Sequence, residues 1–239
     1  MPRYKHYIFD LYGTLVDIRT DEGGRRLWQL TALYFARHGA RYTAPELHRE
    51  YLRLCAAEQA KSSDPYYEFD LRRVFDALYR EKGVTPDQHL VADTAWFFRL
   101  TSTRKLRLYP WVLPAFARIR KSGAGIYLLS NAQACFTLPE LNALGIADAF
   151  DGIVLSSDAG VRKPSPAIMR TLLDTCGLAP ADCLMTGNDR RADVAAARSC
   201  GIDCLYIHTE TSGPMSEGPA ADRELTDGDF SRLPGLLGL

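Results

Sequence analysis

Residues 7–17 read Tyr-Ile-Phe-Asp-Leu-Tyr-Gly-Thr-Leu-Val-Asp, and this stretch decides which fold we expect. Apolar and aromatic residues run directly into Asp10, and Gly13-Thr14 then predicts a turn. The pattern is typical of a short buried strand that presents Asp10 at its carboxyl end. Ligands of open α/β sheets bind outside the carboxyl ends of the strands, so we expect Asp10 to lie in a functional site.

The same arrangement, an apolar strand followed by polar residues, recurs further along the chain. The strands cover 126–129, 152–155 and 183–186, and the polar ends are Ser130-Asn131, Ser156-Ser157-Asp158 and Gly187-Asn188-Asp189. Helical patterns cover 166–176 and 192–200, and residues 201–207 form a further expected strand. Strands that alternate with helices predict an α/β fold with a doubly wound parallel sheet. Residues 209–222, rich in Ser, Gly, Pro and acids, predict a surface loop.

A different pattern separates the first two strands of this predicted sheet. Apolar residues recur at helical spacing in the segments 25–38, 44–61, 67–82 and 86–100. We therefore predict an inserted all-helical domain of residues 18–107. The α/β core then consists of residues 1–17 and 108–239.

The bulk composition favours a globular protein without a general affinity for polyanions. The chain has 239 residues, of which 46% are hydrophobic, so a sizeable core is expected. Lys+Arg and Asp+Glu both number 29, so no net charge attracts nucleic acid or an anionic membrane. The N-terminus lacks an apolar run of signal-peptide length, and no stretch approaches the roughly 20 apolar residues of a membrane span. We expect a soluble, cytoplasmic protein with no nucleic-acid or membrane partner; the sequence does not predict its oligomeric state.

Four motifs carry a resemblance to a known family. Asp-x-x-Gly-Thr-Leu at residues 10–15 resembles the first motif of the haloacid dehalogenase (HAD) superfamily. Ser130 at a strand end resembles the second motif, and Lys163-Pro164 resembles the third. The acidic segment 187–193 resembles the fourth, and the helical insertion resembles a type 1 cap domain. The motifs occur in the order typical of the superfamily, and each follows a predicted strand. The resemblance covers residues 7–208.

This resemblance implies a Rossmann-like core and an aspartate nucleophile that forms a covalent intermediate. Asp10 is the implied nucleophile. Lys163 would keep Asp10 ionised and neutralise charge on a transferring phosphoryl group. The implied catalytic set is Asp10, Tyr12, Ser130 and Lys163, and the implied substrate-binding set is Thr14, Ser130, Asn131 and Lys163.

The fourth motif implies a site for Mg²⁺, because hard oxygen donors suit this cation. The superfamily usually has its first acid of this motif where this chain has Asn188. Asn188 and Asp189 therefore both stay open as the ligand, with Asp193 nearby or bound through water. The implied metal set consists of Asp10, the backbone carbonyl of Tyr12, Asn188, Asp189 and Asp193.

Tyr12 departs from the pattern of most phosphatases of the superfamily, which carry a second aspartate at this position. That aspartate protonates the leaving oxygen and then activates water. A phenol, with an ordinary pKa of about 10, is a poor base near neutral pH. The 2-haloacid dehalogenases of the superfamily do carry tyrosine here, since halide leaves without a proton and no metal is needed. Asp189 beside Asp193, by contrast, favours a phosphatase.

We therefore expect a Mg²⁺-dependent hydrolase that acts on a small phosphorylated metabolite. Two alternatives stay open: a metal-free 2-haloacid dehalogenase, and a non-enzymatic binding module with a HAD fold. Substrate identity should depend on the helical insertion, where Tyr66 and Tyr67 follow Pro65 in a predicted loop. Three basic residues lie near the junction of this insertion with the core: Arg104, Lys105 and Arg107. They either form part of a solvated linker or attract an anionic substrate.

Overall fold

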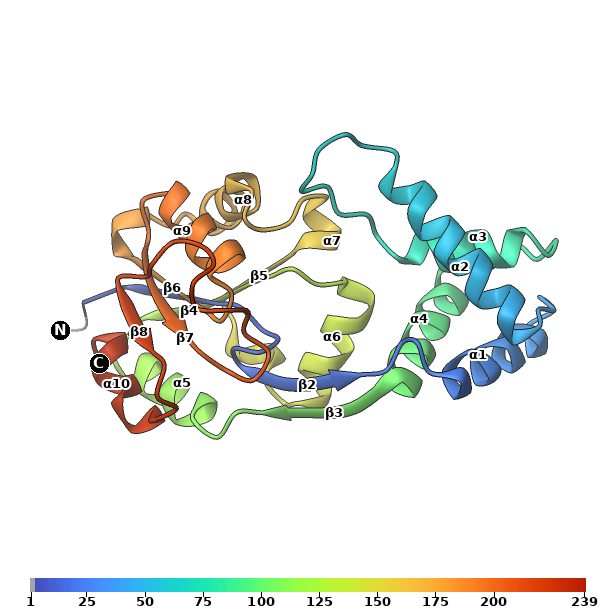
Figure 1. Cartoon of the computed structure of the whole chain (residues 1–239). Coiled ribbons are helices and arrows are strands. Elements are labelled where there is room, and N and C mark those ends of the chain that lie inside the picture. The colour runs from blue at the N-terminus through green and yellow to red at the C-terminus, as the bar shows by residue number, and fades with distance from the viewer. Residues whose placement is uncertain (1–2) are drawn as a thin grey trace.

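The computed structural model describes residues 3–239, with a six-stranded sheet at the centre of the core (Figure 1). Neighbouring strands in this sheet are all parallel, in the order β5-β4-β1-β6-β7-β8. The strands are β1 (His6–Phe9), β4 (Gly125–Ser130), β5 (Gly152–Leu155), β6 (Cys183–Gly187), β7 (Asp203–Ile207) and β8 (Arg223–Leu225). The predicted parallel sheet is confirmed, and Asp10 leaves β1 between β4 and β6.

Helices cover both faces of the sheet because side chains alternate along each strand. Tyr7 and Phe9 of β1 pack into one hydrophobic core, whereas Ile8 packs into the other. The first core includes residues of α5 (Val112–Lys121), α6 (Ala134–Ala143) and α10 (Leu233–Leu237). The second includes residues of α8 (Pro166–Cys176) and α9 (Ala195–Ser199). The short helix α7 (Ser156–Ala159) follows β5, and a π-helical turn, Arg190–Val194, precedes α9.

Four further helices form a layer at one end of the molecule (Figure 1), which we call the helical layer. They are α1 (Arg25–Arg37), α2 (Ala44–Gln59), α3 (Arg72–Arg80) and α4 (Gln88–Ser102). Their buried faces make a core of their own, which Phe136 of α6 joins from the α/β side. A helix therefore forms in each of the four predicted segments, with α4 running two residues past the last of them, while the domain boundaries at residues 17 and 108 stay a prediction. Within residues 3–239, no helix is both long and apolar enough to cross a membrane.

An antiparallel ribbon that no sequence pattern predicted joins the helical layer to the core. It consists of β2 (Val16–Thr20) and β3 (Thr103–Leu108). The basic side chains of β3 form ion pairs with acids on or next to β2: Lys105 and Arg107 with Asp17, and Arg104 with Asp21. These cations are thus engaged within the ribbon and its neighbourhood.

The predicted helix over 67–82 begins later, because its first residues contact the core. Tyr67 forms an isolated antiparallel bridge with Val161. The backbone N–H of Glu68 donates to the carbonyl of Gly160 at 3.1 Å. Since the core supplies these hydrogen-bond partners, the segment stays extended and α3 starts only after it.

Candidate active site

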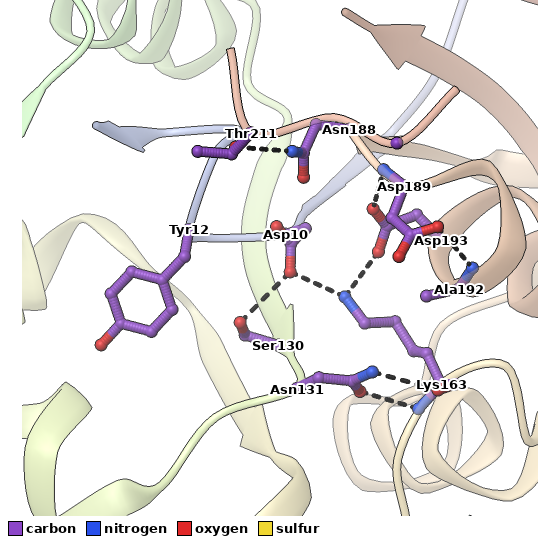
Figure 2. A pocket seen from close by; sticks show the side chains of 11 residues that line it. Asp10, Tyr12, Ser130, Asn131, Lys163, Asn188, Asp189, Ala192, Asp193 and Thr211 are labelled. Atoms are coloured by element: carbon purple, nitrogen blue, oxygen red, sulfur yellow. Dashed lines mark hydrogen bonds and ion pairs between the residues drawn. The ribbon is translucent and has the colours of Figure 1, made fainter. Parts of the chain in front are cut away.

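Asp10 lies at the carboxyl edge of the sheet and borders a pocket of about 220 Å³ (Figure 2). Its backbone N–H donates to the carbonyl of Thr186 at 2.9 Å, which continues the pairing of β1 with β6. Three side chains donate to its carboxylate. Ser130 Oγ and Lys163 Nζ lie 3.2 and 2.8 Å from Oδ1, and Thr14 Oγ1 lies 3.1 Å from Oδ2. The carboxylate is thereby held in one orientation at the pocket wall.

Lys163 is a buried cation between two carboxylates. Its Nζ donates to Asp10 Oδ1, to Asp193 Oδ1 at 2.6 Å and to the carbonyl of Leu129 at 2.8 Å. Burial lowers the pKa of Lys163, but the two carboxylates outweigh burial and raise that pKa above its ordinary value. The Asn131 side chain fixes the lysine backbone, accepting from its N–H at 2.7 Å and donating to its carbonyl at 3.0 Å. A positive charge is therefore held beside Asp10.

Asp193 and Asp189 have different surroundings although they are close in sequence. Asp193 is buried; its Oδ1 accepts from Lys163, and its Oδ2 accepts from the backbone N–H of Asp189 at 2.9 Å. Burial raises the pKa of Asp193, and Asp10 raises it further, while Lys163 lowers it. Asp189 is exposed, and its Oδ1 accepts from the backbone N–H of Arg191 at 2.8 Å as a helix cap. Asp193 thus orients Lys163, and Asp189 caps the following turn.

Asn188 anchors a loop from further along the chain (Figure 2). Its Nδ2 donates to Thr211 Oγ1 at 3.1 Å and to Thr209 Oγ1 at 3.4 Å, and its Oδ1 lies 3.2 Å from Thr14 Oγ1. An aspartate has no N–H to donate to these hydroxyls. Gly13 has φ of 82°, and a Cβ there would lie 2.2 Å from Thr211 Oγ1, so only glycine fits. The loop therefore contributes Thr211 to the pocket wall.

Tyr12 belongs to a second buried polar cluster. Its side chain points away from Asp10 (Figure 2), and its hydroxyl contacts Thr137 Oγ1 at 3.0 Å and donates to the carboxylate of Glu140. The other oxygen of Glu140 accepts from Arg99 Nε at 2.6 Å. Burial raises the pKa of the Tyr12 phenol, and the Glu140 carboxylate raises it further, so the phenol stays protonated near neutral pH. Its hydroxyl is not among the groups that contact Asp10.

The structure brings the residues singled out in the sequence to one pocket. These pocket-lining residues are Asp10, Tyr12, Ser130, Asn131, Lys163, Asn188, Asp189 and Asp193, and Thr14 lies directly behind Asp10. The polar ends of Tyr12 and Asp189 are engaged elsewhere, with Glu140 and with a helix start. The catalytic, substrate-binding and metal-binding roles of these residues stay predictions.

Two residues of these clusters, Thr211 and Arg99, are not among those expected from the sequence. Thr211 lies in the segment predicted as a surface loop, and no local pattern marks it. Arg99 does carry a signal, because it shares the buried face of α4 with Ala95, Phe98 and Ser102. A charged residue on the buried face of a helix indicates a buried partner, which here is Glu140.

The oxygen atoms near Asp10 include few that could hold a metal ion. Asp10 Oδ2 and Asn188 Oδ1 both lie within 3.2 Å of Thr14 Oγ1, and the backbone carbonyl of Tyr12 follows on the same turn. Such hard oxygen donors match the preference of Mg²⁺. Across residues 3–239, however, no group of three or more His, Cys, Asp or Glu side chains is arranged to hold a metal ion. The donor set fits Mg²⁺ in type but carries less negative charge than an acidic cluster.

Comparisons with known proteins relate the chain to one family of enzymes. Residues 4–201 match the family described as haloacid dehalogenase-like hydrolases. The chain is 30% identical over 161 residues to a phosphoserine phosphatase of Thermus thermophilus, an alignment that covers 67% of this chain and 62% of that protein. It is 24% identical over 237 residues to a glyceraldehyde 3-phosphate phosphatase of Pyrococcus furiosus, covering 99% of this chain and 93% of the other.

Solved structures show the same fold. The crystal structure of a 2-haloacid dehalogenase from Pseudomonas syringae pv. tomato aligns with a TM-score of 0.71 over 98% of both chains, at 21% identity. A likeness at this identity shows the fold alone. The similar proteins thus include both phosphatases and a dehalogenase, and the choice between these reactions depends on the residues of the site.

Proposed function

Because the chain belongs to the haloacid dehalogenase-like hydrolases, we propose that it hydrolyses a phosphate ester of a small metabolite, with Asp10 as the nucleophile. The observation that carries this proposal is the Asp10 carboxylate, which three donors orient at the wall of an open pocket. The phosphatases among the sequence relatives support the substrate class. The buried ammonium of Lys163 supplies positive charge where phosphoryl oxygens would gather.

In the proposed reaction, the Asp10 carboxylate attacks phosphorus, and the bond from phosphorus to the leaving oxygen breaks. Water then attacks the aspartyl-phosphate, which releases inorganic phosphate and restores the carboxylate. Lys163 and Ser130 would bind phosphoryl oxygens through both steps. Because the Tyr12 hydroxyl is bonded to Glu140 and turned away from Asp10, the leaving oxygen would take its proton from water. The proposal therefore includes slow turnover of esters with basic leaving groups.

The proposed cofactor is Mg²⁺, held by Asp10, Asn188 and the backbone carbonyl of Tyr12. When bound, this ion would neutralise charge on the phosphoryl group. Two of the three donors are neutral, so the site should bind Mg²⁺ weakly.

The test is a parallel assay of p-nitrophenyl phosphate, phosphoserine, glyceraldehyde 3-phosphate and 2-chloropropionate, each with Mg²⁺ and with EDTA. Phosphate release that needs Mg²⁺ and disappears in Asp10→Asn is the expected result. Full phosphatase activity in Asp10→Asn would remove Asp10 from the proposed role. The folded state of the variant is checked by its thermal unfolding curve.

A second candidate function is the metal-free dehalogenation of 2-haloacids. It is favoured by Tyr12, by the neutral Asn188, and by the lack of a three-acid metal group within residues 3–239. Asp10 would form an ester with carbon as the carbon–halogen bond breaks and halide leaves, and water would then cleave the ester. Neither a general acid nor a metal ion is required. Chloride release from 2-chloropropionate that EDTA does not affect would establish this function in place of the first.

A further inference from the structure

We propose that Tyr12, Arg99 and Glu140, here called the Tyr12 cluster, act as positioning residues that hold the helical layer against the core beside the nucleophile. The three side chains come from three elements: the turn after β1, helix α4 and helix α6. Glu140 is the shared partner, since one carboxylate oxygen accepts from Arg99 Nε and the other from the Tyr12 hydroxyl. The cluster thus joins the helical layer, the core and the turn that carries Asp10.

The burial of the Tyr12 cluster makes its geometry specific. Arg99 is 7% exposed and Glu140 is 1% exposed, so water cannot replace a lost partner at either charge without rearrangement. The Arg99 guanidinium also lies 5.4 Å from the centre of the Tyr12 ring and 5.2 Å from that of Phe136. Both oxygens of Glu140 are therefore bonded, and the cation is enclosed by two rings. A fully bonded buried network of this kind favours one arrangement of its elements.

The surrounding apolar contacts do not specify position as closely as the polar contacts do. Phe98 of α4 stacks on Phe136 of α6 with ring centres 6.2 Å apart, and this contact provides buried apolar area. Hydrophobic contact is not directional, whereas hydrogen bonds to the two oxygens of Glu140 are. We infer that the apolar surface holds α4 on α6 and that the Tyr12 cluster sets their register.

The position of the helical layer also determines where one wall of the cleft beside the pocket lies. Tyr12 lines the pocket at Asp10 while its hydroxyl takes part in the cluster. Tyr66, from the loop between α2 and α3, lines an adjoining cleft of about 470 Å³ together with Asn131 and Lys163. If the Tyr12 cluster were loosened, fewer molecules would have both Tyr12 at the pocket and Tyr66 at the adjoining cleft in place. The apparent affinity for substrate falls in proportion to that fraction of molecules. This consequence for substrate rests on the proposed function.

The test compares Tyr12→Phe in two backgrounds. The substitution removes only the hydroxyl and keeps the ring beside Arg99. In the wild-type background we expect faster hydrogen exchange in α4 and α6 and a KM for p-nitrophenyl phosphate raised about fivefold, the size expected for one lost hydrogen bond. In Arg99→Met/Glu140→Met the hydroxyl keeps only Thr137 as a partner, so Tyr12→Phe should have a much smaller effect on exchange and on KM than in the wild-type background. The matched control is Arg80→Met, which removes an exposed ion pair with Asp76 inside the helical layer.

The outcomes separate positioning from catalysis. A positioning role leaves the pH profile of kcat unchanged in Tyr12→Phe. A kcat that falls a hundredfold with loss of one limb of that profile, at unchanged KM, would instead make Tyr12 an acid or base and overturn the proposal. Equal effects of Tyr12→Phe in both backgrounds, or unchanged exchange in α4, would also overturn it. Hydrogen exchange needs no substrate, so a protein without phosphatase activity still gives a clear answer about the Tyr12 cluster.

Discussion

Two buried charged clusters lie on either side of the turn after β1, and they are built differently. Around Asp10, the single ammonium of Lys163 faces two carboxylates, and the cluster borders an open pocket. Around Glu140, the guanidinium of Arg99 pairs with the buried Glu140 carboxylate and, at 3.6 Å, with the exposed Glu22, and the neutral phenol of Tyr12 bonds the second oxygen of Glu140. The first cluster borders space for a ligand, and burial raises the pKa of its Asp193; in the second, each side chain is bonded to another. A chemical group in the first is available to react, whereas each group in the second has a partner already.

The comparison explains why a motif position can change its role. Tyr12 stands two residues after Asp10, the proposed nucleophile, at the position where most phosphatases of the superfamily carry an aspartate. The longer phenol instead reaches the neighbouring cluster, where Glu140 accepts a hydrogen bond from its hydroxyl. Substitutions and a substrate series separate the proposed reactive cluster from the structural one, and they are ordered by the size of the expected effect.

The largest effect is expected from Asp10→Asn. The amide keeps the size of the side chain but is a far weaker nucleophile, so kcat/KM for the true substrate should fall by about 10⁴-fold or more, as for other nucleophile removals. The midpoint of thermal unfolding should change little. Steady-state kinetics and a thermal unfolding curve measure the two quantities. A loss of activity that merely follows a loss of folded protein would contradict the assignment.

The second effect is on stability, in the Tyr12 cluster. Arg99→Met leaves the Glu140 carboxylate buried without its cation, so the free energy of unfolding should fall by about 3–5 kcal/mol. Arg99→Met/Glu140→Met removes both charges and should recover most of this loss, because the two methionines fill similar volume. Denaturant unfolding of both variants measures the difference. A double variant that is less stable than the single variant would show that the two charges are not coupled.

The third effect is a dependence on the leaving group. Because the Tyr12 hydroxyl is turned away from Asp10, p-nitrophenyl phosphate, whose leaving group needs no proton, should react about 10²-fold faster in kcat than phosphoserine. The measurement is kcat for a series of aryl and alkyl phosphates against leaving-group pKa. A flat series would mean that another group protonates the leaving oxygen, or that a step other than ester cleavage limits the rate.

The fourth effect distinguishes the two candidate ligands for Mg²⁺. Asn188→Asp adds a carboxylate facing Thr14 and should tighten Mg²⁺ binding about tenfold, which corresponds to about 1.4 kcal/mol. Asp189→Asn is the matched change at the neighbouring residue, and it should leave Mg²⁺ affinity nearly unaltered because Asp189 caps a helix. Titration calorimetry with Mg²⁺ gives both affinities. A large loss in Asp189→Asn would identify Asp189 as the ligand.

The smallest effect concerns pH and the adjoining cleft. Burial raises the pKa of Glu68 above its ordinary value of 4.5, against the influence of Arg162 and of a hydrogen bond from Gln133. The folded protein therefore holds this proton more tightly than the unfolded chain, and the associated stability is present below pH 4.5 and is lost as pH rises through the raised pKa. Glu68→Gln should reduce this loss, so that wild type and variant differ more at pH 8 than at pH 4. Denaturant unfolding across this range provides the measurement, and parallel curves would contradict it.

Much of the α/β core followed from local sequence patterns. Apolar runs with polar ends marked β1, β4, β5 and β6, since buried parallel strands are nearly continuous in apolar residues. The carboxyl ends of parallel strands meet at one edge of a sheet, so Asp10 and Ser130 could be expected to converge. The β2–β3 ribbon was not predicted, because its two strands are half-exposed and neither has a clear apolar pattern on its own. The strands are also about 85 residues apart in the sequence, so no local pattern indicates that they pair.

The sequence by itself determined the family, the strand that ends in Asp10 and the identity of the groups available for chemistry. Only the tertiary structure decided what Tyr12, Asn188 and Asp189 contact. Tyr12 meets a carboxylate 128 positions further along the chain, and Asn188 meets a loop hydroxyl 23 positions away. Strand periodicity depends on neighbours in sequence, but the direction of a polar side chain depends on whichever partner the fold places within hydrogen-bond distance. A residue such as Tyr12 can therefore occupy a position in a sequence motif while its side chain makes a structural contact elsewhere.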